Sequence, residues 1–429
     1  MNKKIKWGCI QPLTGGMYLG AQKAIGHPAE FIISYPGLCD KIEKDGEIYN
    51  CNNEYHLLKY LEKHNVLPQY KVFNKTPFEI KNIEDITLNS VADFTDDSKE
   101  IDFSDIDIIV SVPVCSGLSQ ATIASDNTKQ SKNCNMIFNA EYSLGVIKPK
   151  IYIFENAPAL YNSERGQDTR NILNTIAEKY NYSITYYKTD TKFHDNCQKR
   201  PRTFVLFFRN DEVSGTPDMN FEQISTTVTE YMSRLKTDAN NVTTIEMSQI
   251  NNYLFDFIKY YYGKDFRTLV KGDVLNIIND NNLYNDALSY FKSNNINDDS
   301  LDKIKTIFEH IQYKKSLGKN FYSCAPFICA SDSKNIGACT FKTIKQIIHH
   351  KEDRLYNVKE WLHLMGHPSD FELYGNVNLV YEQIGQNVPV RTAQWIVSEA
   401  VRIVSNWENI ERNNPRIMYF DNTKCLKNK

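Results

Sequence analysis

A cysteine that directly follows an apolar run is the first residue in this sequence that could do chemistry. Residues 105–114 read Asp-Ile-Asp-Ile-Ile-Val-Ser-Val-Pro-Val, and Cys115 is followed by Ser-Gly-Leu-Ser. A β-branched run bounded by Asp on one side and by Pro, Gly and Ser on the other is typical of a buried parallel strand. Ligands in open α/β sheets bind just beyond the carboxyl ends of such strands. Cys115 is therefore a candidate nucleophile, and the alternative is a thiol that only packs in the core.

A carboxylate stands in the same position after a second apolar run. Residues 151–154, Ile-Tyr-Ile-Phe, predict another buried strand, and Glu155 follows it directly. A carboxylate at the end of a buried strand costs free energy unless it is paired or used in function. Glu155 is therefore a candidate active-site group, and the alternative is that it caps the following helix.

The amino-terminal stretch reads as a strand, a glycine turn and a helix. A strand is expected over residues 5–10, followed by Thr14-Gly15-Gly16-Met17 and an amphipathic run through Ala24. This order is typical of the phosphate- or nucleoside-binding start of a doubly wound fold. A glycine pair alone is weak support, because tight turns need glycine for steric reasons.

Strands and helices alternate as far as about residue 214. Strands are also expected over 30–35, 184–187 and 203–208, and helices over 54–64 and 169–180. This alternation predicts an α/β fold with a doubly wound, mostly parallel sheet. Residues 120–134 are rich in Ser, Thr, Asn and Lys and poor in apolar anchors, which predicts a mobile loop that can act as a lid.

Helical stripes replace the strands from about residue 215. Apolar residues recur at helical spacing around 254–262, 283–291 and 304–311, and we expect them to form core faces. Residues 314–350 tilt basic, which suits a surface that faces a polyanion, with a solvated face as the simpler alternative.

Strand and helix patterns of the α/β type return near residue 351. A chain that leaves one domain, builds a second and comes back explains this order. We therefore expect the main part of a catalytic domain over residues 1–214, a smaller, largely helical inserted domain over 215–350, and a return to the first domain over 351–429.

Composition narrows the class of protein. The formal net charge of −2 gives no global attraction to nucleic acid. The 10 cysteines are dispersed without the short spacing of a zinc cluster, which indicates free thiols in a reducing cytosol and predicts no metal site. The start of the chain lacks the apolar core of a signal peptide, and no later run is long enough to span a bilayer. A cytoplasmic protein without membrane contact is expected.

Five motifs, taken in order, resemble those of the DNA (cytosine-5) methyltransferase family, over nearly the whole chain outside the helical insert. The first three are Pro113-Val114-Cys115-Ser116-Gly117-Leu118-Ser119, similar to Pro-Cys-Gln-Gly-Phe-Ser; Phe154-Glu155-Asn156-Ala157, similar to Glu-Asn-Val; and Gln198-Lys199-Arg200-Pro201-Arg202, similar to Gln-x-Arg-x-Arg. Residues 354–360 followed by Gly366-His367-Pro368 resemble the segment that closes the family's target-recognition domain, and residues 383–388 resemble its terminal signature.

The resemblance implies a Rossmann-like catalytic domain that acts on cytosine in DNA. Cys115 would add to carbon 6 of a flipped-out cytosine, and Glu155 would hold and protonate the ring nitrogen. Arg200 and Arg202 would orient the base and support the developing charge. S-adenosylmethionine would donate the methyl group to carbon 5. The implied partner is double-stranded DNA, with a cognate restriction nuclease as a further partner, and a monomer is expected.

The resemblance also implies binding residues. Those expected to bind the donor are Thr14, Gly15, Gly16, Met17, Asp85, Ile86, Pro113, Gln386 and Asn387. Those expected to contact DNA are Ser119, Lys129, Lys132, Gln198, Lys334 and Lys342. Target choice would belong to the inserted domain.

Departures from the family pattern are concentrated on the donor side. The family's Phe-x-Gly-x-Gly-Gly appears here as Gln11-Pro12-Leu13-Thr14-Gly15-Gly16, and Tyr35-Pro36-Gly37 stands where the family has an acid for the ribose hydroxyls. Val114, Ser116 and Gln386 replace the family's Pro, Gln and Asn. Two alternatives therefore stay open: the same activation of cytosine with a different transferred group, and a DNA-binding homologue that no longer catalyses.

Overall fold

The computed structural model describes most of the chain: residues 4–35, 39–44, 47–52, 54–74, 80, 85–92, 101–114, 118, 126–211, 213–235, 245–246, 249–264, 280, 282–316, 336–339, 344, 347–375 and 377–423. The chain divides into two compact units. Unit 1 comprises Met1–Asn196, Arg200–Ser225 and Leu362–Lys429, and unit 2 comprises Cys197–Lys199 and Thr226–Trp361.

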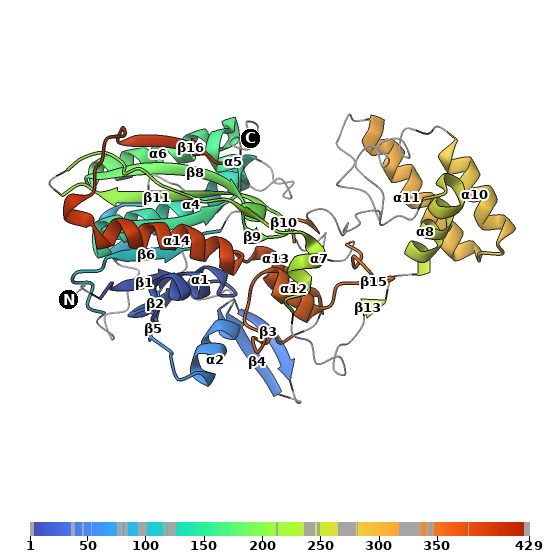
Figure 1. Cartoon of the computed structure of the whole chain (residues 1–429), viewed down its shortest axis with the longest axis horizontal. Helices are drawn as coiled ribbons and strands as arrows, with labels where there is room; N and C mark the ends of the chain where they lie inside the picture. Colours follow the sequence, from blue (N-terminus) through green and yellow to red (C-terminus); the bar gives the residue numbers. More distant parts are fainter. Residues whose placement is uncertain are drawn as a thin grey trace. The chain divides into compact units, whose positions relative to one another are not determined.

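An eight-stranded sheet forms the centre of unit 1, in the order β16-β8-β11-β7-β6-β1-β2-β5 (Figure 1). Its strands are β1 (Trp7–Ile10), β2 (Phe31–Ser34), β5 (Gln69–Val72), β6 (Ile108–Ser111), β7 (Ile151–Asn156), β8 (Tyr182–Asp190), β11 (Pro201–Arg209) and β16 (Ile417–Asp421). The five strands from β5 to β7 run parallel, whereas β11 is antiparallel to both of its neighbours. The mostly parallel sheet expected from the alternating pattern is confirmed.

Helices cover both faces of this sheet (Figure 1). Helices α4 (Asp126–Tyr142) and α6 (Gln167–Lys179) share one apolar cluster with alternate strand residues such as Ile10, Ile33 and Phe154. Helix α1 (Gly16–Ile25) packs against α14 (Val390–Ser405) on the opposite face. Because strand side chains alternate between faces, Cys9, Ser34 and Glu155 belong to the α1 face.

Most elements expected in unit 1 lie close to where the sequence places them. The strands expected over 5–10 and 30–35 are β1 and β2, and the helix expected over 54–64 is α2 (Tyr55–Lys63). A hairpin of β3 (Cys39–Lys44) and β4 (Glu47–Asn52) separates β2 from α2 and was not expected. The shorter elements of unit 1 are α3 (Leu88–Ala92), a π-helical turn (Ser143–Ile147), α5 (Ala159–Asn162), β9 (His194–Asn196), β12 (Ile224–Ser225) and α13 (Val377–Gln386).

The loop prediction for residues 120–134 is wrong from Asp126 onward, because helix α4 begins there. The apolar residues that anchor this helix, including Met136, Ile137 and Phe138, lie in its second half. A window that ends at residue 134 contains the polar first half of the helix and misses its buried second half, so the helix reads as a loop.

Unit 2 is largely helical in the part of the chain that the structure describes. Its main helices are α8 (Gln249–Tyr262), α10 (Leu283–Ser293) and α11 (Asp298–Ser316), and they share one apolar cluster. The smaller elements are β10 (Gln198–Lys199), α7 (Val228–Met232), β13 (Ile245–Glu246), β14 (Ile336–Gly337) and β15 (Arg354–Leu355), and α12 (Val358–Leu364) begins here and ends in unit 1. The apolar stripes of the sequence therefore form a core, as expected. A target-recognition role for this unit stays a prediction.

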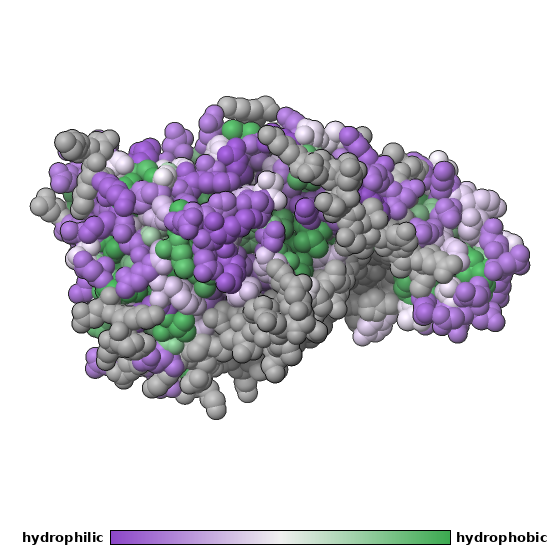
Figure 2. Space-filling model, turned by 90° about the horizontal axis from the view of Figure 1, so that it is seen from below, coloured by the Kyte–Doolittle hydropathy of each residue, from purple (hydrophilic) through white to green (hydrophobic). Residues whose placement is uncertain are grey.

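On the face shown in Figure 2, hydrophilic residues predominate and hydrophobic ones appear in small separate areas. Among the described residues, no helix is both long and apolar enough to cross a membrane.

Candidate active site

Strand pairing brings Glu155 and Arg202 together. Glu155 is near the carboxyl end of β7 and lies opposite Phe204 of β11. Because β11 runs antiparallel to β7, the start of β11 lies at the edge of the sheet where β7 ends. Arg202 Nε consequently lies 2.5 Å from Glu155 Oε1 in an ion pair. Two residues that are far apart in the sequence thus form one charged pair at the sheet edge.

Burial dominates the acidity of Glu155. The residue is 4% exposed. Desolvation raises the pKa of its carboxyl above the ordinary value, and the positive charges of Arg202 and Arg200 only partly oppose this. Glu155 therefore keeps its proton at a higher pH than an exposed glutamate does, which suits a group that must donate a hydrogen bond or a proton.

Arg200 is bound to the terminal segment of unit 1. Its Nη2 donates hydrogen bonds of 2.8 Å to the carbonyl oxygens of both Gly385 and Asn387, and its backbone N–H donates to Asp190 Oδ1 at 2.9 Å. The side chain is 1% exposed. The structure therefore places Arg200 between β11 and the end of α13. Its positive charge is close enough to Glu155 to act against the rise in the pKa of that carboxyl.

The segment that leads to Cys115 starts beside Glu155. Strand β6 is the parallel neighbour of β7, and Asn156 Nδ2 lies 3.5 Å from the carbonyl oxygen of Pro113. The N–H of Val114 donates to Asn135 Oδ1 of α4 at 2.9 Å. Cys115 itself lies outside the described residues, so its role stays a prediction.

The glycine turn is joined to the carboxyl-terminal part of the chain. Gly15 has φ +96°, a left-handed conformation that glycine adopts without strain, and it precedes α1. The N–H of Gly16 donates to Asn387 Oδ1 at 2.9 Å, and Thr14 Oγ1 donates to the carbonyl oxygen of Gln383 at 3.0 Å. The expected donor-binding residues Thr14, Gly16 and Asn387 therefore lie together.

A histidine completes this junction. Asn387 Nδ2 lies 2.9 Å from His367 Nε2, and burial lowers the pKa of His367 to about 4, so the ring is neutral at pH 7. His367 was read from the sequence only as part of a motif. Nothing in the sequence links it to the glycine turn, because 353 positions separate it from Thr14.

Gly16→Ala tests how tightly this junction is packed. A Cβ at position 16 would overlap the carbonyl oxygen of Val388, which is backbone and cannot rotate away. We expect the change to lower the free energy of unfolding of unit 1 by about 1–3 kcal/mol or more, as overpacking does. Urea unfolding followed by circular dichroism measures this. Lys23→Ala, on the exposed side of the same helix, is the control and should unfold as the wild type does.

Other expected donor-binding residues lie in less enclosed positions. Gln386 is exposed, and its Nε2 donates to Glu382 of the same helix at 2.9 Å. Asp85 is exposed and its carbonyl oxygen accepts from Ser90 Oγ, whereas Ile86 is largely buried in the apolar cluster of the α4 face. Met17 is buried in the first turn of α1. The structure groups these residues less closely than it groups Thr14, Gly16 and Asn387.

For most of the residues expected to contact DNA, the side chain or the whole residue lies outside the described part of the chain. Gln198 is fully buried in unit 2, where its Oε1 accepts from the N–H of Cys339 at 3.0 Å. The backbone of Lys129 and Lys132 belongs to α4. The side chains of both lysines, and the whole of Ser119, Lys334 and Lys342, lie outside the described residues.

Two buried polar residues near the glycine turn were missed as functional candidates by sequence reasoning. Gln11, directly after β1, is 1% exposed, and neither its Nε2 nor its Oε1 has a hydrogen-bond partner in the structure. Glu54, directly before α2, is 2% exposed and its Oε1 accepts from Ser34 Oγ at the end of β2. A buried amide directly after β1 and a buried carboxylate bonded to the last residue of β2 are a signal that only the fold reveals.

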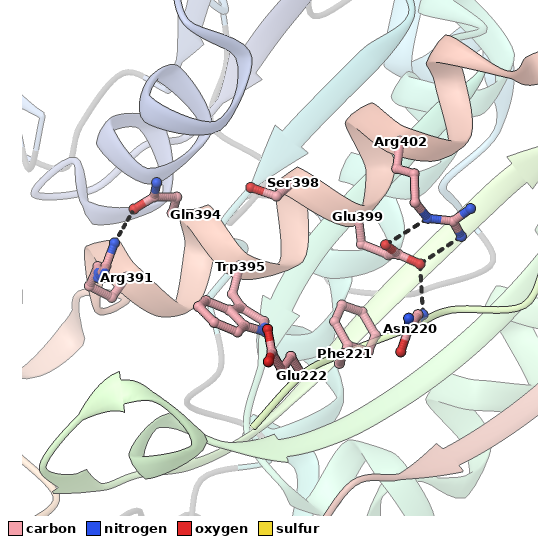
Figure 3. A pocket seen from close by; sticks show the side chains of 9 residues that line it. All are labelled: Asn220, Phe221, Glu222, Arg391, Gln394, Trp395, Ser398, Glu399 and Arg402. Carbon is pink, nitrogen blue, oxygen red and sulfur yellow. Dashed lines mark hydrogen bonds and ion pairs between the residues drawn. The ribbon is translucent and has the colours of Figure 1, made fainter. Parts of the chain in front are cut away.

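A separate hollow of about 320 Å³ lies along the outer side of α14 (Figure 3). Its charged groups bind one another: Arg402 pairs with Glu399 at 2.8 Å, Glu399 accepts from the N–H of Asn220, and Arg391 pairs with Asp195 at 2.7 Å. None of the lining residues, all of them described, has a buried side-chain polar atom without a partner. The hollow therefore shows no group that calls for a ligand, in contrast to Gln11.

Within the described part of the chain, no group of three or more His, Cys, Asp or Glu side chains could hold a metal ion.

Several known proteins resemble this chain in sequence or in structure. A stretch of 86 residues is 37% identical to a candidate type II methyltransferase of Methanocaldococcus jannaschii, and it spans 20% of this chain and 25% of that protein. A candidate DNA modification methyltransferase encoded within a prophage (E. coli) matches the structure with a TM-score of 0.50 at 16% identity, over 94% of this chain and 99% of its own. Methyltransferase EhMeth of Entamoeba histolytica also gives 0.50, at 11% identity, over 95% and 100%. These two likenesses show the fold.

A family model covers most of the active-site candidates. Residues 70–402 match the C-5 cytosine-specific DNA methylases, and this stretch includes the cysteine motif, Glu155 and both arginines. The glycine turn and α2 precede this stretch. Because the match spans well over half of the sequence and the sheet is the mostly parallel one of a methyltransferase, the chain belongs to the C-5 cytosine-specific DNA methylase family.

Proposed function

We propose that the protein is a DNA methyltransferase that transfers a methyl group from S-adenosylmethionine to carbon 5 of cytosine in double-stranded DNA. The observation that carries this proposal is the buried Glu155–Arg202 pair at the carboxyl edge of the sheet, beside the strand that leads to Cys115. In a chain of this family, the pair lies where a cytosine ring can be held while a thiol attacks it.

The residues around the glycine turn fit a donor of this kind. A buried amide without partners costs about 1–3 kcal/mol per unsatisfied group, so Gln11 gains from a polar ligand beside β1. Such a ligand would be held by the turn from Thr14 to Met17, with Pro113 and Asn387 nearby. When bound, S-adenosylmethionine supplies a methyl group on a positively charged sulfur, which keeps the bonding electron pair when a carbon nucleophile takes the methyl.

Addition of Cys115 to the ring turns carbon 5 of cytosine into that carbon nucleophile. Carbon 5 of cytosine is unreactive until the Cys115 thiolate bonds to carbon 6 and the electron pair of the ring double bond moves toward carbon 5 and the ring nitrogen. After methylation, loss of the carbon 5 proton to solvent restores the double bond and expels the thiolate. The two steps together replace hydrogen by methyl and return Cys115 unchanged.

Glu155 and Arg202 hold the ring during these steps. The raised pKa of Glu155 favours the protonated carboxyl, which donates to the ring nitrogen as negative charge develops there. Arg202 Nε donates to Glu155 Oε1 and keeps the carboxyl in place in either protonation state, and the ring nitrogen returns its proton to Glu155 when the thiolate leaves. Arg200, bound to Gly385 and Asn387, acts as a positioning residue that ties β11 to the donor side of the site.

Unit 2 is assigned to target choice. A base inside a duplex is out of reach, so the target cytosine must be flipped out and its neighbours held by another part of the protein. Unit 2 is the part of the chain that does not contribute to the sheet.

The experiment is direct. The protein is incubated with duplex DNA and S-adenosylmethionine carrying a labelled methyl group, and the nucleosides are analysed by mass spectrometry. We expect label in 5-methylcytosine only, and bisulfite sequencing of the product then gives the target sequence. A modified cytosine of another mass would support a different transferred group. Unlabelled DNA from every duplex sequence tried, with tight DNA binding, would support a homologue that no longer catalyses.

A further inference from the structure

The position after β2 cannot offer an acid to the methyl donor. Tyr35 stands there, and its ring stacks on Phe73 with centroids 5.1 Å apart, while its hydroxyl donates to Asn139 Oδ1 at 2.5 Å. Both partners lie on the α4 face of the sheet. Tyr35 therefore points away from the α1 face, where the glycine turn lies.

A carboxylate reaches the end of β2 from another element. Glu54 lies directly before α2, and its Oε1 accepts from Ser34 Oγ and, at 3.2 Å, from the hydroxyl of Tyr70 in β5. Ser34 is the last residue of β2 and belongs to the α1 face. The β3–β4 hairpin separates the two residues by 20 positions. After the hairpin, the chain comes back to the end of β2 and places the carboxylate of Glu54 there.

Helix α2 also contacts the glycine turn. A Cβ at Gly15 would lie 2.7 Å from Leu57 Cδ1, so the first turn of α2 packs directly on Gly15. The pKa of the Cys9 thiol in β1 is raised by burial and by the charge of Glu54, which agrees with a carboxylate near β1 as well as β2. Glu54 therefore lies at the end of β2 where the chain leaves the strand, which is the edge of an open α/β sheet that binds ligands.

A second and independent observation points to a ligand at this edge of the sheet. Gln11 follows β1, the neighbour of β2, and its fully buried amide has no partner at either polar atom. Buried amides are almost always bonded, so the exception calls for an occupant. A polar ligand that lies across the ends of β1 and β2 would meet Gln11 on one side and Glu54 on the other.

We propose that Glu54, held in place by Ser34 and Tyr70, is the carboxylate that binds the ribose hydroxyls of the methyl donor. The inference rests on the proposed function, because it names a residue of the same donor site. A carboxylate accepts hydrogen bonds at about four positions, and neighbouring hydroxyls of a ribose are two donors spaced to bind it. Charge-assisted bonds of this kind are the strong ones. The acid that is missing after β2 is thereby supplied from the start of α2.

The test measures binding and does not depend on turnover. Calorimetry gives Kd for S-adenosylhomocysteine and for its analogue without the two ribose hydroxyls, with wild type, Glu54→Gln and Glu62→Gln. Glu62 is an exposed glutamate of the same helix and serves as the matched control. We expect the wild type and Glu62→Gln to bind the analogue about 10- to 100-fold more weakly. In Glu54→Gln the two ligands should differ by about threefold or less.

Two results separate this inference from the proposed function. Binding of S-adenosylhomocysteine with unchanged discrimination in Glu54→Gln overturns the role of Glu54 and leaves the donor in place. Failure of the wild type to bind either ligand overturns both. Ser34→Ala gives a second route, because it keeps the acid but removes the hydroxyl that holds it. We expect this variant, too, to lose several-fold discrimination, and full discrimination would contradict the proposal.

Discussion

A Cys115→Ser chain is expected to methylate DNA at least about 10⁴ times more slowly than the wild type. A serine hydroxyl is a far weaker nucleophile than a thiolate, and loss of a covalent nucleophile removes most of the rate enhancement of an enzyme that depends on it. Single-turnover transfer of labelled methyl groups to duplex DNA measures the effect. Trapping on duplex DNA that contains 5-fluorocytosine gives a second measure, because only the thiol forms the stable adduct.

The control for this variant is another cysteine. Cys134 is fully buried in the apolar cluster of α4 and sits in no position to reach a base. Cys134→Ala should keep its methylation rate within a few-fold and should still form the adduct. Full activity in Cys115→Ser, or loss of trapping in Cys134→Ala alone, would show that the nucleophile lies elsewhere.

Glu155→Gln is expected to lower turnover by about 10²- to 10⁴-fold, the usual worth of a positioned acid. The amide has the same size, but it cannot transfer a proton to the ring nitrogen. It also breaks the ion pair with Arg202. Glu164→Gln, an exposed position soon after the same strand, is the control and should be active.

The pH dependence of turnover distinguishes Glu155→Gln from the wild type. Burial raises the pKa of Glu155, so the protonated carboxyl persists to higher pH than in an ordinary glutamate and disappears as the pH rises through that pKa. Wild-type turnover should therefore fall as the pH rises through the pKa of Glu155. Turnover of Glu155→Gln should lack this fall, because glutamine does not titrate. A Glu155→Gln profile that keeps the same alkaline loss would argue that the proton comes from another group.

Parallel strands were the part of the fold that the sequence predicted best. β6 and β7 are short runs of β-branched and aromatic residues, buried on both faces, and such runs are conspicuous in any sequence. β5 was missed because its sequence, Gln-Tyr-Lys-Val, contains no apolar run, whereas β16 was missed although residues 417–420 are apolar. Helix α4 was missed in part because its polar first half has no apolar anchor.

Contacts between side chains were harder to predict from the sequence than the strands themselves. Glu155 and Arg202 could be named from motifs, but their contact follows from the antiparallel direction of β11, which no local pattern encodes. Arg200 looked equivalent to Arg202, yet its guanidinium is bound to carbonyl groups 185 and 187 positions away. Glu54 was read only as the start of a helix, because the hairpin separates it in the sequence from the end of β2, which it contacts in the fold.

The three-residue stretch Cys197–Lys199 has a practical meaning for the exchange of unit 2 between relatives. Strand β10 pairs with β14, and Gln198 holds the backbone of Cys339, so this stretch is structurally part of unit 2 although it precedes the arginines of unit 1. A chimaera that transplants residues 226–361 alone would carry β14 without its partner strand. Replacement of unit 2 in this protein therefore requires two separate pieces of the relative's gene, with Arg200 and Arg202 left in the recipient.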